Sequence, residues 1–234
     1  MDFKINIKEA FDQISEIYDR VRRQPWKDLI DFIDDYNFLN ECDVSLDIGC
    51  GNGRHTNILA GKCNLSIGIE LSNELLKIAE ESRKHSNIYF INCDAVHLPF
   101  RNDMFSNIIF IATLHHISTT QQRIESLKEL KRVLNPSGKA IITVWRRFQE
   151  RFFLIFLIDF FFLTFQKKWL EFGDIFVPWH GPNKKIMVNR FYHLFTITEF
   201  KTILKKADMN ILECKYFSGK TKNENIIALI KRKK

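Results

Sequence analysis

One run of eight residues, 46–53, constrains the fold of this chain more than any other feature. It reads L-D-I-G-C-G-N-G, with glycine at positions 49, 51 and 53. A short apolar strand that enters a glycine turn and then a helix is typical of nucleotide-binding α/β sheets. A dinucleotide fingerprint would require glycine where this chain has Arg54, and a phosphate-binding loop would require G-K-S or G-K-T after the turn. The run therefore predicts a nucleotide-like ligand that lacks a pyrophosphate.

The chemistry of that ligand is indicated by Asp47, two residues before the first glycine. A carboxylate at this place repels a diphosphate but attracts an ammonium or a sulfonium group. S-adenosylmethionine (SAM) carries both of these cations. The run also resembles the cofactor-binding motif of class I SAM-dependent methyltransferases, which implies that SAM is the cofactor.

From residue 44 onward, short β-like runs alternate with helical runs. We expect helices near 53–60, 73–84 and 121–134, and strands at 44–48, 65–69, 88–92, 105–111, 140–145, 211–217 and 225–231. This alternation predicts an α/β fold, namely a doubly wound, seven-stranded, Rossmann-like sheet of the class I methyltransferase type. The length suits a single domain over residues 1–234.

Two segments lie outside that alternation. Amphipathic stretches at 8–21 and 26–39 predict an N-terminal helical cap over residues 1–42, and the first stretch has Phe11 and Tyr18 on its apolar stripe. Residues 147–190 interrupt the pattern after the fifth expected strand, and we expect an inserted helical segment there. Because ligands bind at the carboxyl edge of such sheets, this insertion is expected to build the substrate site.

Charge and cysteine content limit the partners and the setting. The formal net charge is +7, which suits an anionic partner such as RNA or an anionic membrane surface, although a lysine-rich composition alone gives the same number. The five cysteines form no C-x-x-C pair, so we expect neither a disulfide framework nor a metal site. A reducing, cytoplasmic location is expected, and the first residues show no signal peptide.

The most apolar run of the chain is 152–165, which is rich in phenylalanine and is interrupted by Asp159. It is shorter than the roughly 20 residues that a membrane-spanning helix requires, so no transmembrane segment is expected. We interpret it as a buried or partner-covered helix, with a helix in a membrane interface as the alternative.

Two acidic residues follow expected strands at positions suited to an adenosine group. Glu70 ends the second strand, where a carboxylate can accept two hydrogen bonds from a ribose diol. Its alternative role is a helix N-cap, but Ser72 fills that role better. Asp94 ends the third strand and is expected to accept a hydrogen bond from the adenine amino group.

The residues after the fourth expected strand indicate the nucleophile, because in methyl transfer the protein mainly positions the acceptor. This segment has neither an N-P-P-Y turn, which binds exocyclic amines, nor a Pro-Cys pair, which attacks a pyrimidine carbon. An oxygen nucleophile fits better, such as a carboxylate that needs no deprotonation. His115 and His116 stand at the expected mouth of the site, and we expect one of them, His116 first, to act there. The alternative is that one caps a helix and the other packs.

Two clusters distant from the glycine turn pair arginine with aromatic residues, namely Arg22 with Trp26 and Arg190 with Tyr192. An arginine can bind a carboxylate or a phosphate through two parallel hydrogen bonds, and an aromatic ring can stack on a base. The alternative interpretation is surface ion pairs and buried aromatics.

Together, these motifs narrow the resemblance. The chain resembles the tRNA wobble-uridine methyltransferases that esterify 5-carboxymethyluridine. The matching motifs are R-R-Q-P-W (22–26), L-D-I-G-C-G-N-G (46–53), D-A-V-H-L-P-F-R (94–101), A-T-L-H-H-I-S-T (112–119), R-I-E-S-L-K-E-L-K-R-V-L (123–134), V-P-W-H (177–180) and R-F-Y-H-L-F (190–195). The chain departs from the family pattern after Phe105, where F-D is usual but Ser106 and Asn107 follow, and at Pro136-Ser137-Gly138, where P-G-G is usual.

The resemblance implies a tRNA substrate, SAM as cofactor and a small zinc-containing activator protein as partner. The residues expected to bind the cofactor are Asp47, Gly49, Cys50, Gly51, Asn52, Gly53, Glu70, Leu71, Asp94, Ala95 and Ile111. Those expected to act on the substrate are Arg22, Trp26, His116, Arg190 and Tyr192, with Trp145 in the pocket. The alternatives are a methyltransferase for a small molecule or a lipid, and a non-catalytic scaffold that retains the fold.

Overall fold

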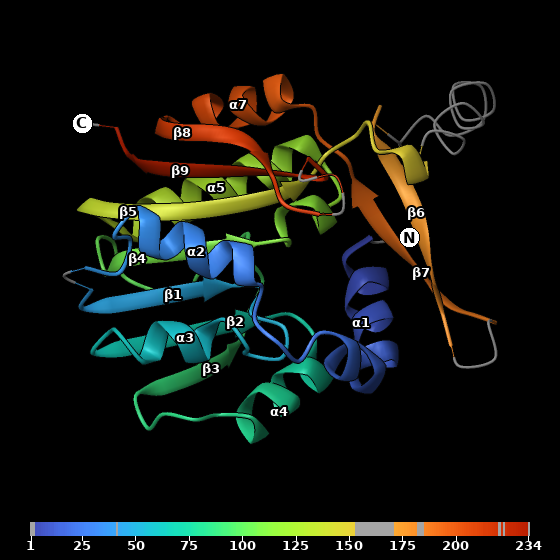
Figure 1. Cartoon of the computed structure of the whole chain (residues 1–234), viewed down its shortest axis with the longest axis horizontal. Coiled ribbons are helices and arrows are strands. Elements are labelled where there is room, and N and C mark those ends of the chain that lie inside the picture. Colours follow the sequence, from blue (N-terminus) through green and yellow to red (C-terminus); the bar gives the residue numbers. More distant parts are fainter. Residues whose placement is uncertain are drawn as a thin grey trace.

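The computed structural model describes residues 3–40, 42–152, 171–181, 185–219, 221 and 223–233. A seven-stranded sheet has the strand order β3-β2-β1-β4-β5-β9-β8 (Figure 1). The first five strands are parallel, whereas β9 and β8 run antiparallel to their neighbours. This order, which runs outward in both directions from β1, confirms the expected doubly wound α/β fold. The strands are β1 (Val44–Ile48), β2 (Leu65–Glu70), β3 (Ile88–Asn92), β4 (Phe105–Ile111), β5 (Leu134–Trp145), β8 (Met209–Phe217) and β9 (Asn225–Arg232).

Helices cover both faces of this sheet, which is why its central strands are apolar on both sides. On β4, Ile108 and Phe110 belong to the core formed with α5 and α7, whereas Ile109 and Ile111 belong to the core formed with α2 and α3. The helices are α1 (Phe3–Val21), α2 (Lys27–Asp35), α3 (Thr56–Ala60), α4 (Asn73–Glu81), α5 (Thr120–Val133) and α7 (Ile197–Lys206), with single 3₁₀ turns η1 (Leu114–His116) and η2 (Glu150–Phe152).

Several bounds differ from those expected from the sequence. Helix α3 begins at Thr56 rather than at residue 53, because the glycine turn extends further than expected. Helix α2 ends at Asp35, and Asn37 just after it has a left-handed backbone with φ of 46°, which a continuing helix cannot contain. Strand β5 begins at Leu134, directly after α5.

The insertion differs more from what was expected. Its described part contains a β-hairpin, β6 (Asp174–His180) and β7 (Ile186–His193), which the sequence argument did not predict. The β-branched and aromatic residues of these strands favour extended backbone. The hairpin forms a separate two-stranded sheet, and α1 lies between it and the main sheet (Figure 1). The expected helix at 152–165 lies outside the described residues except for Phe152.

A disulfide joins Cys42 to Cys63, with their Cα atoms 4.9 Å apart, so the expectation of no disulfide is wrong. Each cysteine stands two residues before a strand, and the first residues of these strands, Val44 and Leu65, are register partners. Adjacent parallel strands thus bring the two thiols together at the edge of the sheet where the strands begin. None of the described helices is long and apolar enough to cross a bilayer.

Candidate functional site

A cavity of about 730 Å³ lies at the edge of the sheet where the parallel strands end. Most of the residues expected to form the site line this one cavity. From the cofactor set these are Gly49, Cys50, Gly51, Asn52, Glu70, Leu71, Asp94, Ala95 and Ile111. From the substrate set they are Arg22, Trp26, His116, Trp145, Arg190 and Tyr192. Segments distant in sequence therefore meet around one space.

Two residues of the cofactor set, Asp47 and Gly53, do not line the cavity. The carboxylate of Asp47 is buried and accepts a 2.7 Å hydrogen bond from the hydroxyl of Thr56, the first residue of α3. Burial raises the pKa of Asp47 to about 7, and the bond from Thr56 only partly opposes this rise. Asp47 thus connects β1 to α3, whereas the sequence argument placed it against the ligand.

Gly53 is required by close packing rather than by contact with the cavity. It has a left-handed backbone with φ of +74°, and a Cβ atom there would lie 2.8 Å from the ring of Phe90 on β3. A side chain at this position would therefore both strain the backbone and push against the sheet.

Glu70 organises the glycine turn. One carboxylate oxygen accepts a 2.9 Å hydrogen bond from the amide of Gly51, and the other accepts 2.9 Å bonds from the amides of Leu71 and Ser72. Burial raises the pKa of Glu70, against the effect of these three amides. Each carboxylate oxygen can accept more than one hydrogen bond, so Glu70 can still bind a ribose diol.

The helix cap near Glu70 agrees with the sequence argument. The hydroxyl of Ser72 accepts a bond from the amide of Leu75 and caps α4, as expected. At the end of β3, the carboxylate of Asp94 accepts a 3.0 Å bond from the amide of Val96. The two acidic residues of the cofactor set that line the cavity, Glu70 and Asp94, are thus held by backbone amides.

An aromatic wall lines the same cavity as the glycine turn. The rings of Trp145 and Tyr192 stack with centroids 4.3 Å apart, and His116 lies 4.3 Å from Tyr192. Beside this wall, Arg190 on β7 lies between two aromatic faces, 4.6 Å from the Trp179 centroid and 5.2 Å from that of Tyr192. Aromatic faces attract a guanidinium group and fix its plane.

Arg190 is buried, with 7% of its surface exposed, and its Nε atom has no hydrogen-bond partner. Among the described residues, no carboxylate forms an ion pair with it. A buried cation without a counter-charge is costly, so the site is suited to bind an anion.

His115 and His116, which the sequence argument placed at the entrance of the site, both line the cavity, and both are neutral. Burial lowers the pKa of His116 to about 3 and that of His115 well below its ordinary value. His116 Nδ1 donates a 2.9 Å bond to the carbonyl of Phe191, so its Nε2 is an acceptor. His115 Nδ1 accepts a 3.2 Å bond from the amide of Trp145, so its proton is on Nε2. Neither ring is charged at neutral pH.

Helix α1 contributes cavity residues that the sequence argument missed. Phe11 lies 5.0 Å from the ring of His116, and Tyr18 lies 6.2 Å from that of Trp179. The helix is fixed to the cofactor side of the cavity, because Asp12 accepts a 2.6 Å bond from Ser72 and Asp19 accepts a 2.8 Å bond from Asn52. The apolar stripe of α1 was visible in the sequence, but the surface that it covers was not.

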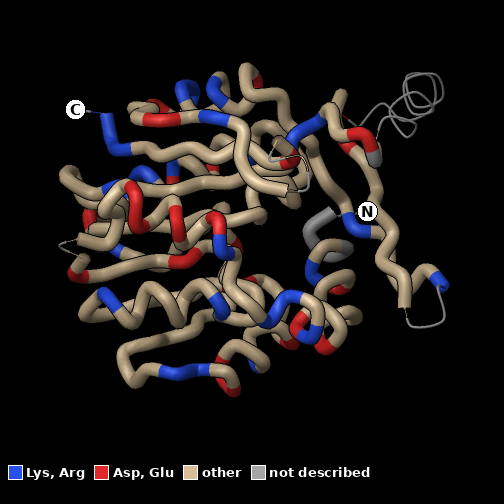
Figure 2. The backbone as a smooth tube through the Cα atoms, in the orientation of Figure 1, with Lys and Arg blue, Asp and Glu red and all other residues tan. Residues whose placement is uncertain are grey.

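Besides Arg190, five lysine and arginine residues line the cavity, and they come from the last turn of α1, the connection to α2, the start of α2 and the glycine turn. Figure 2 shows basic segments where α1 passes into α2. Arg54 donates a 2.6 Å bond to the carbonyl of Arg22, which also accepts a 3.2 Å bond from Asn52. Within the described part of the chain, three of these residues form no ion pair. We call the following set the basic rim: Arg20, Arg22, Arg23, Lys27 and Arg54.

Comparisons with known proteins were made for sequence and for structure. The family model described as "Methyltransferase domain" matches residues 46–142. Mouse tRNA (carboxymethyluridine(34)-5-O)-methyltransferase ALKBH8 is 32% identical over 145 residues, which are 62% of this chain and 20% of the mouse protein. The chain thus spans about a fifth of this relative's length.

Two further relatives with the same enzyme name are covered more fully. The one from Arabidopsis thaliana is 31% identical over 86% of this chain and 46% of its own length. The one from Schizosaccharomyces pombe is 27% identical over 90% of this chain and 91% of its own length. The second relative matches almost from end to end, so the likeness extends beyond the shared cofactor motifs.

Solved structures show the same fold. A SAM-dependent methyltransferase from Methanosarcina mazei superimposes with a TM-score of 0.70 at 22% identity, over 85% of this chain and 96% of its own. A Haloferax volcanii putative methyltransferase, solved in complex with the Trm112 methyltransferase activator, has a TM-score of 0.67 at 13% identity, over 97% of this chain and 98% of its own.

Proposed function

This chain belongs to the tRNA wobble-uridine (5-carboxymethyluridine) methyltransferase family, within the class I SAM-dependent methyltransferases, and on that premise we propose the reaction that it catalyses. It transfers the methyl group of SAM to the carboxylate of 5-carboxymethyluridine at the wobble position of a tRNA anticodon. The product is a methyl ester. When bound, SAM supplies an activated methyl group on a sulfonium.

The cavity fits this cofactor. Its volume of about 730 Å³ lies within the range of roughly 300–1,000 Å³ that is usual for ligand pockets. In the proposal, Glu70 binds the ribose, Asp94 binds the adenine amino group, and the glycine turn approaches the amino-acid end. These assignments rest on the position of each residue at the cavity.

The observation that carries the proposed reaction is the environment of Arg190. Its buried guanidinium lies between Trp179 and Tyr192, and no described carboxylate neutralises it. A substrate carboxylate would supply the missing negative charge and accept hydrogen bonds from the guanidinium. Tyr192 is buried and stacks on Trp145, so in the proposal these two rings form a rigid wall of the pocket and shape it around the uracil ring.

Methylation of a carboxylate needs no catalytic base, because the nucleophile is already ionised at neutral pH. The neutral state of His115 and His116 is compatible with such a reaction. The role of the protein is then to bring the carboxylate oxygen into line with the methyl group and to exclude water. In this proposal Arg190 holds the anion, while Trp26 and His116 shape the pocket around the base.

The basic rim supports an RNA substrate, because its cations surround the same mouth. Lysine and arginine side chains bind phosphates through charge and release counterions from the RNA. The rim is also bonded to the glycine turn through the carbonyl of Arg22. A substrate bound at the rim would therefore contact the segment that also forms the cofactor pocket.

The proposal includes a small zinc-containing activator protein as partner and a cytoplasmic location. The Haloferax volcanii complex supports the partner, because a putative methyltransferase of the same fold binds an activator there. The disulfide gives the location a test. A reducing compartment would keep the Cys42–Cys63 bond open, so in protein extracted under alkylating conditions both cysteines are expected to react with the reagent as free thiols.

The experiment combines the chain, with and without such an activator, with labelled SAM and tRNA that carries 5-carboxymethyluridine. The expected result is label on the RNA that mild base releases, because methyl esters hydrolyse. Label only on unmodified tRNA, on a small molecule or on lipid would contradict the proposal. Absence of SAM binding by calorimetry, with or without the activator, would instead favour a non-catalytic scaffold.

A further inference from the structure

The β6–β7 hairpin carries Arg190 and Tyr192, but it is not part of the main sheet. Its two strands pair with each other and form a separate two-stranded sheet. Hairpins of two strands are marginally stable on their own and depend on packing against other elements. The position of Arg190 therefore depends on how the hairpin is attached to the rest of the fold.

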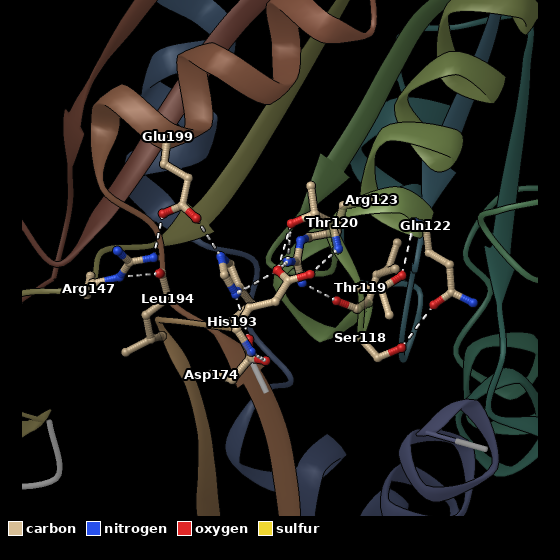
Figure 3. Close-up of polar contacts among 12 residues, drawn as sticks. Ser118, Thr119, Thr120, Gln122, Arg123, Arg147, Asp174, His193, Leu194 and Glu199 are labelled. Carbon is tan, nitrogen blue, oxygen red and sulfur yellow. Dashed lines mark hydrogen bonds and ion pairs between the residues drawn. The ribbon is translucent and has the colours of Figure 1, made fainter. Parts of the chain in front are cut away.

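A buried group of charged residues lies at the base of the hairpin, where β6 begins and β7 ends (Figure 3). Asp174 and His193 are register partners across the two strands, and His193 Nδ1 donates a 2.6 Å bond to the carboxylate of Asp174. Both side chains are almost completely buried. We call the following residues the hairpin network: Arg123, Arg147, Glu171, Asp174, His193 and Glu199.

His193 links the hairpin to helix α7. Its second nitrogen, Nε2, donates a 2.9 Å bond to Glu199, whose other oxygen accepts a 2.5 Å bond from Arg147. The imidazole of His193 is thus held between two carboxyl groups, one on the hairpin and one on α7. Burial alone would raise the pKa of Glu199, but the bond and charge of His193 and the charge of Arg147 hold it below its ordinary value.

Glu171 links the hairpin to helix α5. Its carboxylate accepts bonds from the amide of Thr120 at 2.8 Å and from the hydroxyl of Thr120 at 2.6 Å. It also forms an ion pair with Arg123, whose side chain is fully buried. The backbone amide of Glu171 donates a 2.7 Å bond to Asp174, so the α5 contacts continue into the hairpin. Three carboxyl groups thus face two guanidinium groups and one imidazole ring.

A divalent metal is the alternative occupant of this place, since Glu171, Asp174 and His193 offer atoms within 4.8 Å of one another. However, each of these atoms already has a partner in the network. Nδ1 of His193 donates to Asp174, and the carboxylate of Glu171 accepts from Thr120 and Arg123. A metal would have to displace these donors. The carboxyl groups of the network are therefore already satisfied by hydrogen bonds and by the charges of Arg123 and Arg147.

The network and the substrate pocket lie on opposite faces of one strand. Side chains alternate along a strand, so Arg190 and Tyr192 face the cavity while His193 faces the network. We propose that the hairpin network is a positioning device that fixes the base of the β6–β7 hairpin to α5 and α7 and thereby holds Arg190 and Tyr192 at the substrate. The network therefore affects substrate binding and leaves the residues that line the cofactor side of the cavity unaffected. The identity of the substrate rests on the proposed function, whereas the attachment of the hairpin to α5 and α7 rests on the contacts described above.

Two variants test the network at different strengths. Glu199→Gln keeps an acceptor for His193 but places an amide against Arg147. Thr120→Val removes one hydroxyl donor to Glu171 and keeps the shape of the side chain, so it remains informative should Glu199→Gln not fold. The matched control is Glu129→Gln, which removes another part-buried carboxylate that is paired with an arginine, Arg132 on α5, away from the hairpin.

The first measurement is hydrogen–deuterium exchange of the whole chain without RNA, together with SAM affinity by calorimetry. In both variants, amides of β6 and β7 should exchange faster than in the wild type, by about tenfold in Glu199→Gln. The exchange rates of β1 and β4 should stay unchanged, and SAM affinity should stay within about twofold of the wild-type value. Unchanged hairpin exchange in both variants would overturn the proposal, as would equal acceleration in the main sheet. Loss of hairpin protection on treatment with a chelator would show a metal instead.

The second measurement is methyl transfer to tRNA that carries 5-carboxymethyluridine. Glu199→Gln should raise KM for the RNA by about tenfold with a smaller change in kcat, and Glu129→Gln should change neither. A fall in kcat with KM unchanged would overturn the positioning role. If the wild-type protein does not methylate this RNA, the proposed function fails, whereas the exchange measurement still decides on the network.

Discussion

The guanidinium of Arg190 lies 4.6 Å from the ring centroid of Trp179, and these two residues stand on the opposite strands of one hairpin. Neither strand alone forms the site, because the cation comes from β7 and the aromatic face from β6. In our proposal, the hairpin therefore brings an anion-binding group to the cavity at the edge of the sheet that carries the expected cofactor motif. The predictions below follow from this division between a cofactor half and a substrate half.

Replacement of Arg190 tests the substrate half. Arg190→Gln should lower kcat/KM for 5-carboxymethyluridine in tRNA by about a hundredfold, because a charge-assisted pair in a buried site is lost. Arg190→Lys should retain part of the activity, since it keeps the charge but not the planar group that stacks between the rings. Arg83→Gln, at an exposed position two residues after the end of α4, is the control. Equal activity of Arg190→Gln and the control would remove Arg190 from the site.

Replacement of Glu70 tests the cofactor half. Glu70→Gln should weaken SAM binding by about tenfold or more in calorimetry, because an NH2 group would replace one carboxylate oxygen and face either the amide of Gly51 or those of Leu71 and Ser72 as a second donor. The control is Glu74→Gln at the start of α4, which removes an exposed ion pair with Lys77. If SAM affinity is unchanged in Glu70→Gln, the assignment of this residue to the ribose is wrong.

The buried carboxyl group of Asp47 predicts a pH dependence of stability. Its pKa is 3.8 ordinarily and about 7 in the folded protein, so the folded state binds the proton more tightly than the unfolded state. Stability from this group is therefore lost as the pH rises from about 4 to about 7. Asp47→Asn should become more stable relative to wild type across this window, by about 2–4 kcal/mol in urea unfolding. The exposed control Asp31→Asn should not show this trend; a trend of opposite sign in Asp47→Asn would refute the account.

The basic rim predicts how RNA binding responds to salt. Arg20→Gln and Arg22→Gln should each weaken tRNA binding and reduce the slope of log affinity against log salt by about one, because one phosphate contact is lost. Lys84→Gln, a basic residue that does not line the cavity, should leave the slope unchanged. Identical slopes in all three variants would place the RNA elsewhere on the surface.

The sequence predicted well what depends on local pattern. Alternating strands and helices predicted the seven strands of the main sheet, whereas the antiparallel direction of β9 and β8 relative to their neighbours was found only in the structure. The capping role of Ser72 was also predicted, because a helix cap is a local interaction. Arg190 and Tyr192 were selected by a motif, and the structure places both at the cavity.

The features that the sequence did not predict depend on contacts between distant segments. Asp47 is bonded to Thr56 on α3, a contact that the motif alone does not indicate. The disulfide depends on the register of β1 with β2, which no local pattern predicts. The hairpin network joins Arg123 to Glu171 across 48 positions, and no local spacing indicates such a pair. The insertion was expected to be helical because its apolar residues are dense, but strand pairing decided its described part.

One comparison tests the central claim, which is that an ionised carboxylate on the uridine receives the methyl group at Arg190. The chain, with its activator if one is required, is incubated with labelled SAM and two tRNAs that differ at the wobble position. One carries 5-carboxymethyluridine and the other carries the uncharged 5-carbamoylmethyluridine of nearly the same shape. The account predicts base-labile label on the first RNA and none on the second. Equal labelling of both RNAs, or label that mild base does not release, would contradict it.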